Sequence, residues 1–104
     1  MYRKGNIVNL GETRQLTSEK TGQTMTLTKI TVYWIESVNQ RQEPDEVTLT
    51  GEMFGEYDLA RIRQAIDAHE QVDFSVYFNV STSKDGRSFN NIRIYLPKSW
   101  RKNA

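Results

Sequence analysis

Basic, aromatic and hydroxyl side chains spread along predicted strands and turns carry the clearest chemistry in this sequence. Lysine and arginine bind phosphate groups, tyrosine rings stack on flat bases, and threonine hydroxyls both donate and accept hydrogen bonds. The candidates of these types are Lys20, Lys29, Thr31, Tyr33, Thr48, Thr50, Tyr77, Lys84, Arg87, Arg93 and Tyr95. Such a set can hold an extended, negatively charged chain if the fold brings the side chains to one surface.

Covalent catalysis and metal binding have little support in the sequence. The chain has one histidine, His69, and no cysteine, and neither a second histidine nor a serine motif accompanies it. Since His69 follows a predicted helix, where the helix dipole favours positive charge, we assign it a structural role. The acidic residues lack the spacing of metal ligands, and there is no glycine-rich phosphate loop. We therefore expect a protein that is not an enzyme and that uses neither metal nor cofactor.

Two alternating runs supply strands that would position several of the candidates. Apolar and polar residues alternate from residue 72 to residue 80 and again from 92 to 96, with a turn signal at 83–86 between them. A period of two is typical of a strand with one buried face, so the two runs predict a hairpin. The side chains predicted to face the core are Val72, Phe74, Val76, Phe78, Val80, Ile92, Ile94 and Leu96.

The order of the remaining elements predicts the fold class. Strands are expected at residues 5–16, 23–37 and 46–54, followed by a helix at about 57–68 and by strands at 71–81 and 89–96. Three strands, a helix and two more strands are typical of the OB-fold. We therefore predict one domain over residues 1–104, an all-β, five-stranded Greek-key OB barrel with one short helix between strands three and four. The residues after Pro97 are expected to form a short basic tail.

The second strand contains a change of parity. Met25 and Leu27 share one parity, whereas Ile30 and Trp34 share the other, which predicts a bulge or bend near residues 28–29. Trp34 is then expected in the core.

The predicted helix has one apolar face. Asp58 is a plausible N-cap or first-turn acid, and Arg61 and Arg63 are expected on the solvated face.

The overall charge of the sequence is close to zero and does not by itself indicate a binding site. The 104 residues include 14 lysine and arginine against 13 acidic residues, a net charge of +1, so any nucleic-acid site must rest on local clustering of charge. No apolar run approaches the ~20 residues of a membrane helix, and the first residues lack a signal-peptide core. Together with the absence of cysteine, this leads us to expect a cytoplasmic protein without a membrane partner.

The middle of the chain resembles bacterial single-stranded DNA-binding proteins. Residues 47–52, including Gly51, are similar to that family's third strand, residues 57–66 to the following helix, and residues 70–76 to the beginning of its fourth strand. The whole chain is also similar to small SSB-like bacterial proteins. The resemblance implies an OB-fold that binds single-stranded DNA. The basic residues 99–104 replace the family's acidic, partner-recruiting tail, and its base-stacking tryptophans have no clear counterparts, so a hub role is not expected.

The fold and the resemblance together predict where a ligand would lie. An OB-fold binds on the outer face of strands two and three and between its first and last hairpin loops. That face would carry Lys29, Thr31, Tyr33, Thr48 and Thr50, the loops Lys20, Lys84 and Arg87, and the outward positions of the last two strands Tyr77, Arg93 and Tyr95. We expect non-catalytic, largely sequence-independent binding of single-stranded DNA, with RNA as a second candidate, by a homodimer or higher homo-oligomer.

Other interpretations remain open. Tyr77 and Tyr95 could pair across strands or fill a dimer interface, and Lys84 and Arg87 could belong to an ordinary solvated turn. The alternative function is an OB-fold protein-interaction or assembly module without nucleic-acid binding, which the near-neutral charge favours. A domain for a small molecule or sugar is a third candidate.

Overall fold

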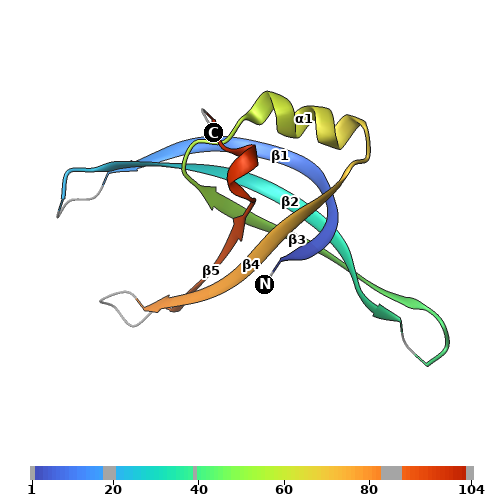
Figure 1. Ribbon diagram of the computed structural model, residues 1–104. Helices are drawn as coiled ribbons and strands as arrows, with labels where there is room; N and C mark the ends of the chain where they lie inside the picture. The colour runs from blue at the N-terminus through green and yellow to red at the C-terminus, as the bar shows by residue number, and fades with distance from the viewer. Residues whose placement is uncertain (1, 18–20, 39, 83–87, 103–104) are drawn as a thin grey trace.

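The described residues, 2–17, 21–38, 40–82 and 88–102 of a computed structural model, form mostly β structure. The strands are β1 (Arg3–Thr17), β2 (Thr24–Val38), β3 (Pro44–Phe54), β4 (Gln71–Thr82) and β5 (Ser88–Tyr95). One α-helix, α1 (Leu59–Asp67), lies between β3 and β4, and a short 3₁₀-helix, Lys98–Trp100, follows β5. The five predicted strands and the position of the helix are therefore confirmed (Figure 1).

The five strands close into a ring in the order β1-β2-β3-β5-β4. Neighbouring strands are antiparallel, except that β3 and β5 are parallel and meet at the single pair Glu52 and Arg93. The ring is completed where the first residues of β1 pair with the first residues of β4, with Arg3 opposite Phe74 and Asn6 opposite Gln71. Helix α1 lies across one side of this ring, next to β1 (Figure 1).

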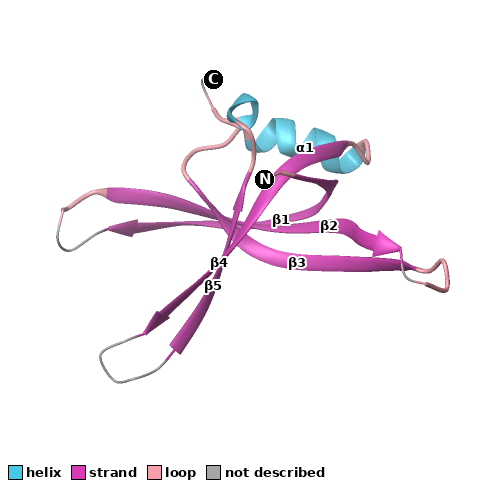
Figure 2. Ribbon diagram, turned by 60° about the horizontal axis from the view of Figure 1, so that its bottom comes forward, coloured by secondary structure: helices cyan, strands magenta, loops and turns pink. Residues whose placement is uncertain are grey.

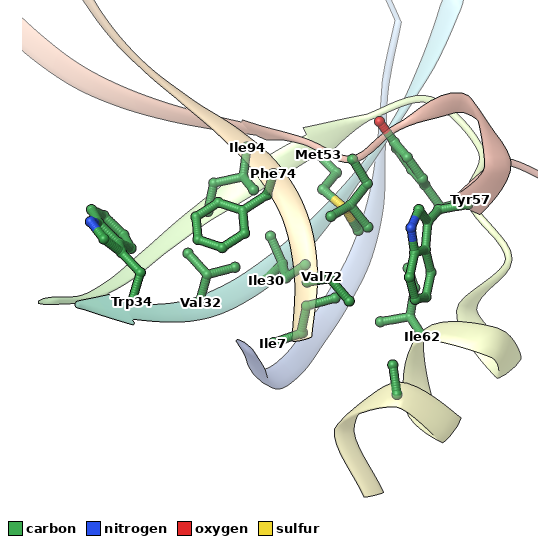
Figure 3. Packing of buried hydrophobic residues seen from close by; sticks show 13 residues of the cluster. Ile7, Ile30, Val32, Trp34, Met53, Tyr57, Ile62, Val72, Phe74 and Ile94 are labelled. Carbon is green, nitrogen blue, oxygen red and sulfur yellow. The ribbon is translucent and has the colours of Figure 1, made fainter. Parts of the chain in front are cut away.

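A cluster of aliphatic and aromatic side chains fills the ring (Figure 3). Phe74 is fully buried, and its ring packs edge-on against Trp34 with centroids 5.6 Å apart. The core positions predicted for Trp34, Val72, Phe74, Ile94 and Leu96 are confirmed, because all five side chains are buried. Val76 and Ile92 are partly buried and pack against the same cluster.

Three hairpins, β1–β2, β2–β3 and β4–β5, extend beyond the ring as two-stranded arms (Figure 2). The predicted core position of Phe78 is wrong, since this side chain is 72% exposed. Its strand keeps the alternating pattern, but the pairing of β4 with β1 ends at Phe74, and Tyr77 and Phe78 are both more than half exposed. Val80 lies outside the residues whose side chains are described.

The irregularity predicted near residues 28–29 is present in the pairing with β1, but the extra residue is not in the second strand. The pairing of β2 with β3 is continuous from Leu27 to Ile35, whereas the register with β1 shifts twice. At both shifts the extra residue belongs to β1: Leu10 lies opposite Ile30, but Thr13 lies opposite Thr28. The chain therefore bends by lengthening β1. The change of parity in β2 comes from Leu27, which lies on the face opposite to the core and is nevertheless fully buried.

Close contact between β3 and β5 sets the position of the outer residues on both strands. Gly51 of β3 is buried, and a Cβ atom at this position would lie 2.8 Å from Cγ2 of Ile92 and 2.9 Å from its carbonyl oxygen. Only glycine permits this approach. The contact brings Glu52 of β3 beside Arg93 of β5.

Helix α1 begins as predicted but holds more contacts than expected. The Asp58 carboxylate accepts a hydrogen bond from the Arg61 backbone nitrogen at 3.1 Å, which confirms it as the N-cap. The interpretation of Arg61 as only a solvated residue is wrong. Its guanidinium forms two hydrogen bonds with Glu70, of 3.0 and 2.9 Å, and lies 4.5 Å above the ring of Trp100.

The segment after Pro97 is not a free tail. Trp100 is buried and belongs to the core cluster, and its carbonyl oxygen accepts a hydrogen bond from the Asp58 nitrogen at 2.9 Å. Arg101 forms an isolated β-bridge with Tyr57. The apolar surface of one tryptophan outweighs the polarity of its neighbours, so the chain folds back over the end of the ring.

Candidate functional site

An open groove of about 800 Å³ lies along β4 and β5, between the end of β3 and the segment after β5. Five of the residues that line it are aromatic and three are basic, and none of its described lining residues is acidic. The lining residues are Tyr2, Phe54, Ser75, Tyr77, Phe78, Arg93, Tyr95, Leu96, Lys98 and Arg101. Three of the sequence-predicted residues, Tyr77, Arg93 and Tyr95, are therefore brought together here.

Strand register places the two tyrosines of the groove on one face. Tyr77 lies opposite Arg93 and Ser75 opposite Tyr95, so Tyr77 and Tyr95 are diagonal neighbours on the outer face. Their rings meet edge-on, with centroids 5.3 Å apart and planes at 77°. The cross-strand pair anticipated as an alternative is thus present. Tyr77 is still 53% exposed, so part of this side chain remains accessible to a ligand.

The guanidinium of Arg93 packs against the wall of the groove. It lies 4.4 Å from the ring centroid of Phe54, at the end of β3, and 3.6 Å from a carboxylate oxygen of Glu52. Its side chain is mostly buried. Stacking on Phe54 and attraction to Glu52 fix the orientation of the cation, so little side-chain entropy would be lost when it binds an anion.

Glu52 is shared between two arginines. Arg14 of β1 donates two hydrogen bonds to its carboxylate, each of 3.0 Å. These bonds lower the pKa of Glu52 below its ordinary value. One negative charge thus faces two positive charges, and the trio Arg14, Glu52 and Arg93 keeps a net charge of +1 beside the groove.

Lys98 and Arg101 also line the groove and make part of its wall basic. Both belong to the segment after Pro97, which the sequence had predicted to be a tail. The backbone bridge to Tyr57 fixes Arg101, whose guanidinium lies 5.0 Å from the centroid of the Tyr57 ring. Lys98 begins the 3₁₀-helix that ends at the buried Trp100. Among the described residues, no carboxylate lies within salt-bridge distance of Lys98 or Arg101.

Seven groove residues were not predicted as site residues: Tyr2, Phe54, Ser75, Phe78, Leu96, Lys98 and Arg101. Phe54 shares the outward parity of Glu52, so the alternation in β3 already contained its signal. For Lys98 and Arg101 the signal was Trp100, since a large aromatic side chain three residues after Pro97 favours docking over a free tail.

The second predicted surface, the outer face of β2 and β3, carries Lys29, Thr31, Tyr33, Thr48 and Thr50. Register pairs Lys29 with Glu52, Thr31 with Thr50 and Tyr33 with Thr48, so the five predicted residues share one face. A shallow pocket of about 180 Å³ near Lys29 and Thr50 is much smaller than the groove.

Several hydrogen-bonding side chains of this face are already paired with one another. The hydroxyl groups of Thr31 and Thr50 are 2.8 Å apart, and the Tyr33 hydroxyl donates a 2.8 Å hydrogen bond to the Glu46 carboxylate. This bond raises the pKa of Tyr33. Glu46 brings negative charge to this face, which makes it less favourable for phosphate than the groove, whose described lining contains no acidic residue.

Glu52 joins the two surfaces, because it pairs with Lys29 on one side and with Arg93 on the other. The remaining predicted residues, Lys20, Lys84 and Arg87, lie outside the described residues.

No group of three or more histidine, cysteine or acidic residues in the described part of the chain could hold a metal ion. No helix there is long and apolar enough to cross a membrane. No protein-family profile matches the chain, and no curated protein shows significant similarity to it.

Proposed function

We propose that the protein is an OB-fold domain that binds single-stranded nucleic acid, DNA or RNA, without catalysis and largely without regard to base sequence. The OB assignment is supported by the ring order β1-β2-β3-β5-β4 and by the position of α1 between β3 and β4. The resemblance of residues 47–76 to single-stranded DNA-binding proteins agrees with this order.

One observation carries the functional proposal: the groove combines aromatic rings with basic side chains, and among the described residues no carboxylate lies within salt-bridge distance of Lys98 or Arg101. Single strands are held by basic residues that contact phosphates and by aromatic faces on which bases stack. In the groove, Tyr77 offers an exposed ring, and Arg93, Lys98 and Arg101 surround it with positive charge. Stacking accepts every base, so this chemistry gives affinity with little sequence preference.

A titration against salt tests the proposal. We expect labelled oligothymidylate of about 16 nucleotides to bind with an affinity that falls as salt rises. Each phosphate contact contributes about −0.7 to the slope of log K against log salt, so three groove cations predict a slope of about −2. Fluorescence anisotropy at several sodium chloride concentrations measures both the affinity and the slope.

Two charge-removing variants make the test specific. Lys98→Gln should weaken binding and reduce the slope by about 0.7, because one phosphate contact is lost. Arg63→Gln removes the same charge from the exposed face of α1, outside the groove, and should leave the slope unchanged. An affinity independent of salt, or no binding at low salt, would contradict the proposal. That result would instead favour a protein-interaction module.

A further inference from the structure

A second groove of about 450 Å³ adjoins the first. The two grooves share Phe54 and Arg101, so both side chains stand at the junction between them. Arg101 is anchored there by its backbone bridge to Tyr57 and by the stacking of its guanidinium on the buried Tyr57 ring. A chain of nucleotides that occupies the first groove therefore meets a fixed cation where the second begins.

The chemistry of the second groove differs from that of the first. Thr24, Met25 and Thr26 of β2 form one wall, and Glu56, after β3, contributes to the other. Threonine hydroxyls and a carboxylate can hydrogen-bond the edge of a base, and a methionine thioether makes favourable contacts with aromatic rings. A carboxylate repels phosphate, so the groove suits an uncharged base and not the backbone.

Met25 gives the second groove an exposed apolar side chain that a base could contact. It lies on the β1–β2 arm and is 44% exposed despite its apolar side chain. Its cross-strand partner Leu16 is also exposed, yet only Met25 lines the groove.

We propose that the second groove is a nucleobase subsite for the same strand that the first groove binds. The strand crosses Arg101, which holds the intervening phosphate, and its next base enters beside Met25. This inference rests on the proposed function and extends it, because it predicts that affinity rises with strand length until both grooves are filled.

The experiment compares Met25→Ala with its matched control Leu16→Ala. Both changes truncate the same cross-strand pair, so any effect on the arm itself is common to them. Oligothymidylates of increasing length, from about 4 to about 16 nucleotides, span the site sizes of OB domains. On the shortest strand that reaches full affinity, Met25→Ala should weaken binding about three-fold to ten-fold. It should leave the binding of the shortest strands unchanged, and Leu16→Ala should match the unmodified protein at every length.

A strand with an abasic nucleotide at one end identifies what occupies the groove. At the end that reaches Met25, removal of the base should weaken binding to the unmodified protein but cause little further loss in Met25→Ala, since the two changes remove the same contact. Equal losses in both proteins at both ends would overturn the subsite. So would identical behaviour of Met25→Ala and Leu16→Ala, while binding by the unmodified protein would still support the proposed function. Failure of the unmodified protein to bind any strand would overturn both.

Discussion

Replacing Tyr77 by alanine tests the groove most directly. The side chain is 53% exposed, so its ring face is available for stacking and contributes little to the core. Stacking of one base is worth about 1–3 kcal/mol, which corresponds to a loss of affinity of about 5-fold to 150-fold. Anisotropy titration with labelled oligothymidylate at low salt measures this loss.

The same substitution should have a modest effect on folding. The contact that Tyr77 makes within the protein is its edge-on pair with Tyr95, and such pairs are worth about 0.5–1.5 kcal/mol. Urea denaturation should therefore show a fall of about 1 kcal/mol in the free energy of unfolding. Tyr77→Phe keeps the ring and should retain most of the binding, because the ring and not the hydroxyl group stacks.

Tyr33→Ala is the matched comparison on the other surface. Tyr33 is also a strand tyrosine on an outer face, but its hydroxyl is held by Glu46. If the nucleic acid instead binds across the outer face of β2 and β3, Tyr33→Ala should weaken binding about ten-fold or more, and Tyr77→Ala should have no effect. That pair of results would refute the assignment of the groove.

The remaining predictions concern folding, pH and assembly. Phe74→Ala should lower the free energy of unfolding in urea by about 3–5 kcal/mol, because it leaves a cavity at a fully buried position; a loss below about 1 kcal/mol would contradict the core assignment. Since Arg14 holds the pKa of Glu52 below its ordinary 4.5, this carboxylate stabilises the fold above about pH 4.5, and the contribution disappears as the pH falls through the lowered pKa. Stability measured from about pH 6 to pH 3 should fall less steeply in Glu52→Gln; parallel curves would show that the pair does not stabilise the fold. Exposed Ile35 and Val38 and the single bridge between β3 and β5 lead us to expect a dimer or higher oligomer in sedimentation equilibrium, which a monomer at every concentration would contradict.

Periodicity predicted which side chains share a face, but not how far the core extends along a strand. Phe74 and Phe78 have the same parity and the same residue type, yet Phe74 is fully buried and Phe78 is exposed. The difference depends on where the ring of strands ends, which is a property of strand pairing between distant segments. For the same reason, the extra residues that bend the sheet could not be assigned to β1 from the pattern in β2 alone.

Only part of the site could be predicted from the sequence, again because part of it depends on contacts between distant segments. Parity in β4 and β5 correctly grouped Tyr77, Arg93 and Tyr95 on one face. Lys98 and Arg101 join them only because Trp100 docks into the core, and a composition-based view of the last residues does not show this. Composition also gave no sign that Glu52 would sit between two arginines.

The arms that extend from the ring have a consequence for hydrogen exchange and for ligand ordering. On the described parts of the arms, apolar side chains such as Met25, Ile35 and Phe78 are exposed, so the apolar burial that fixes register in the ring is missing there. Such segments open locally at a lower free energy than core strands, and their amide hydrogens should exchange earlier than those beside Phe74. A bound nucleic acid that contacts Tyr77 or Met25 should slow this exchange on the arm that it touches.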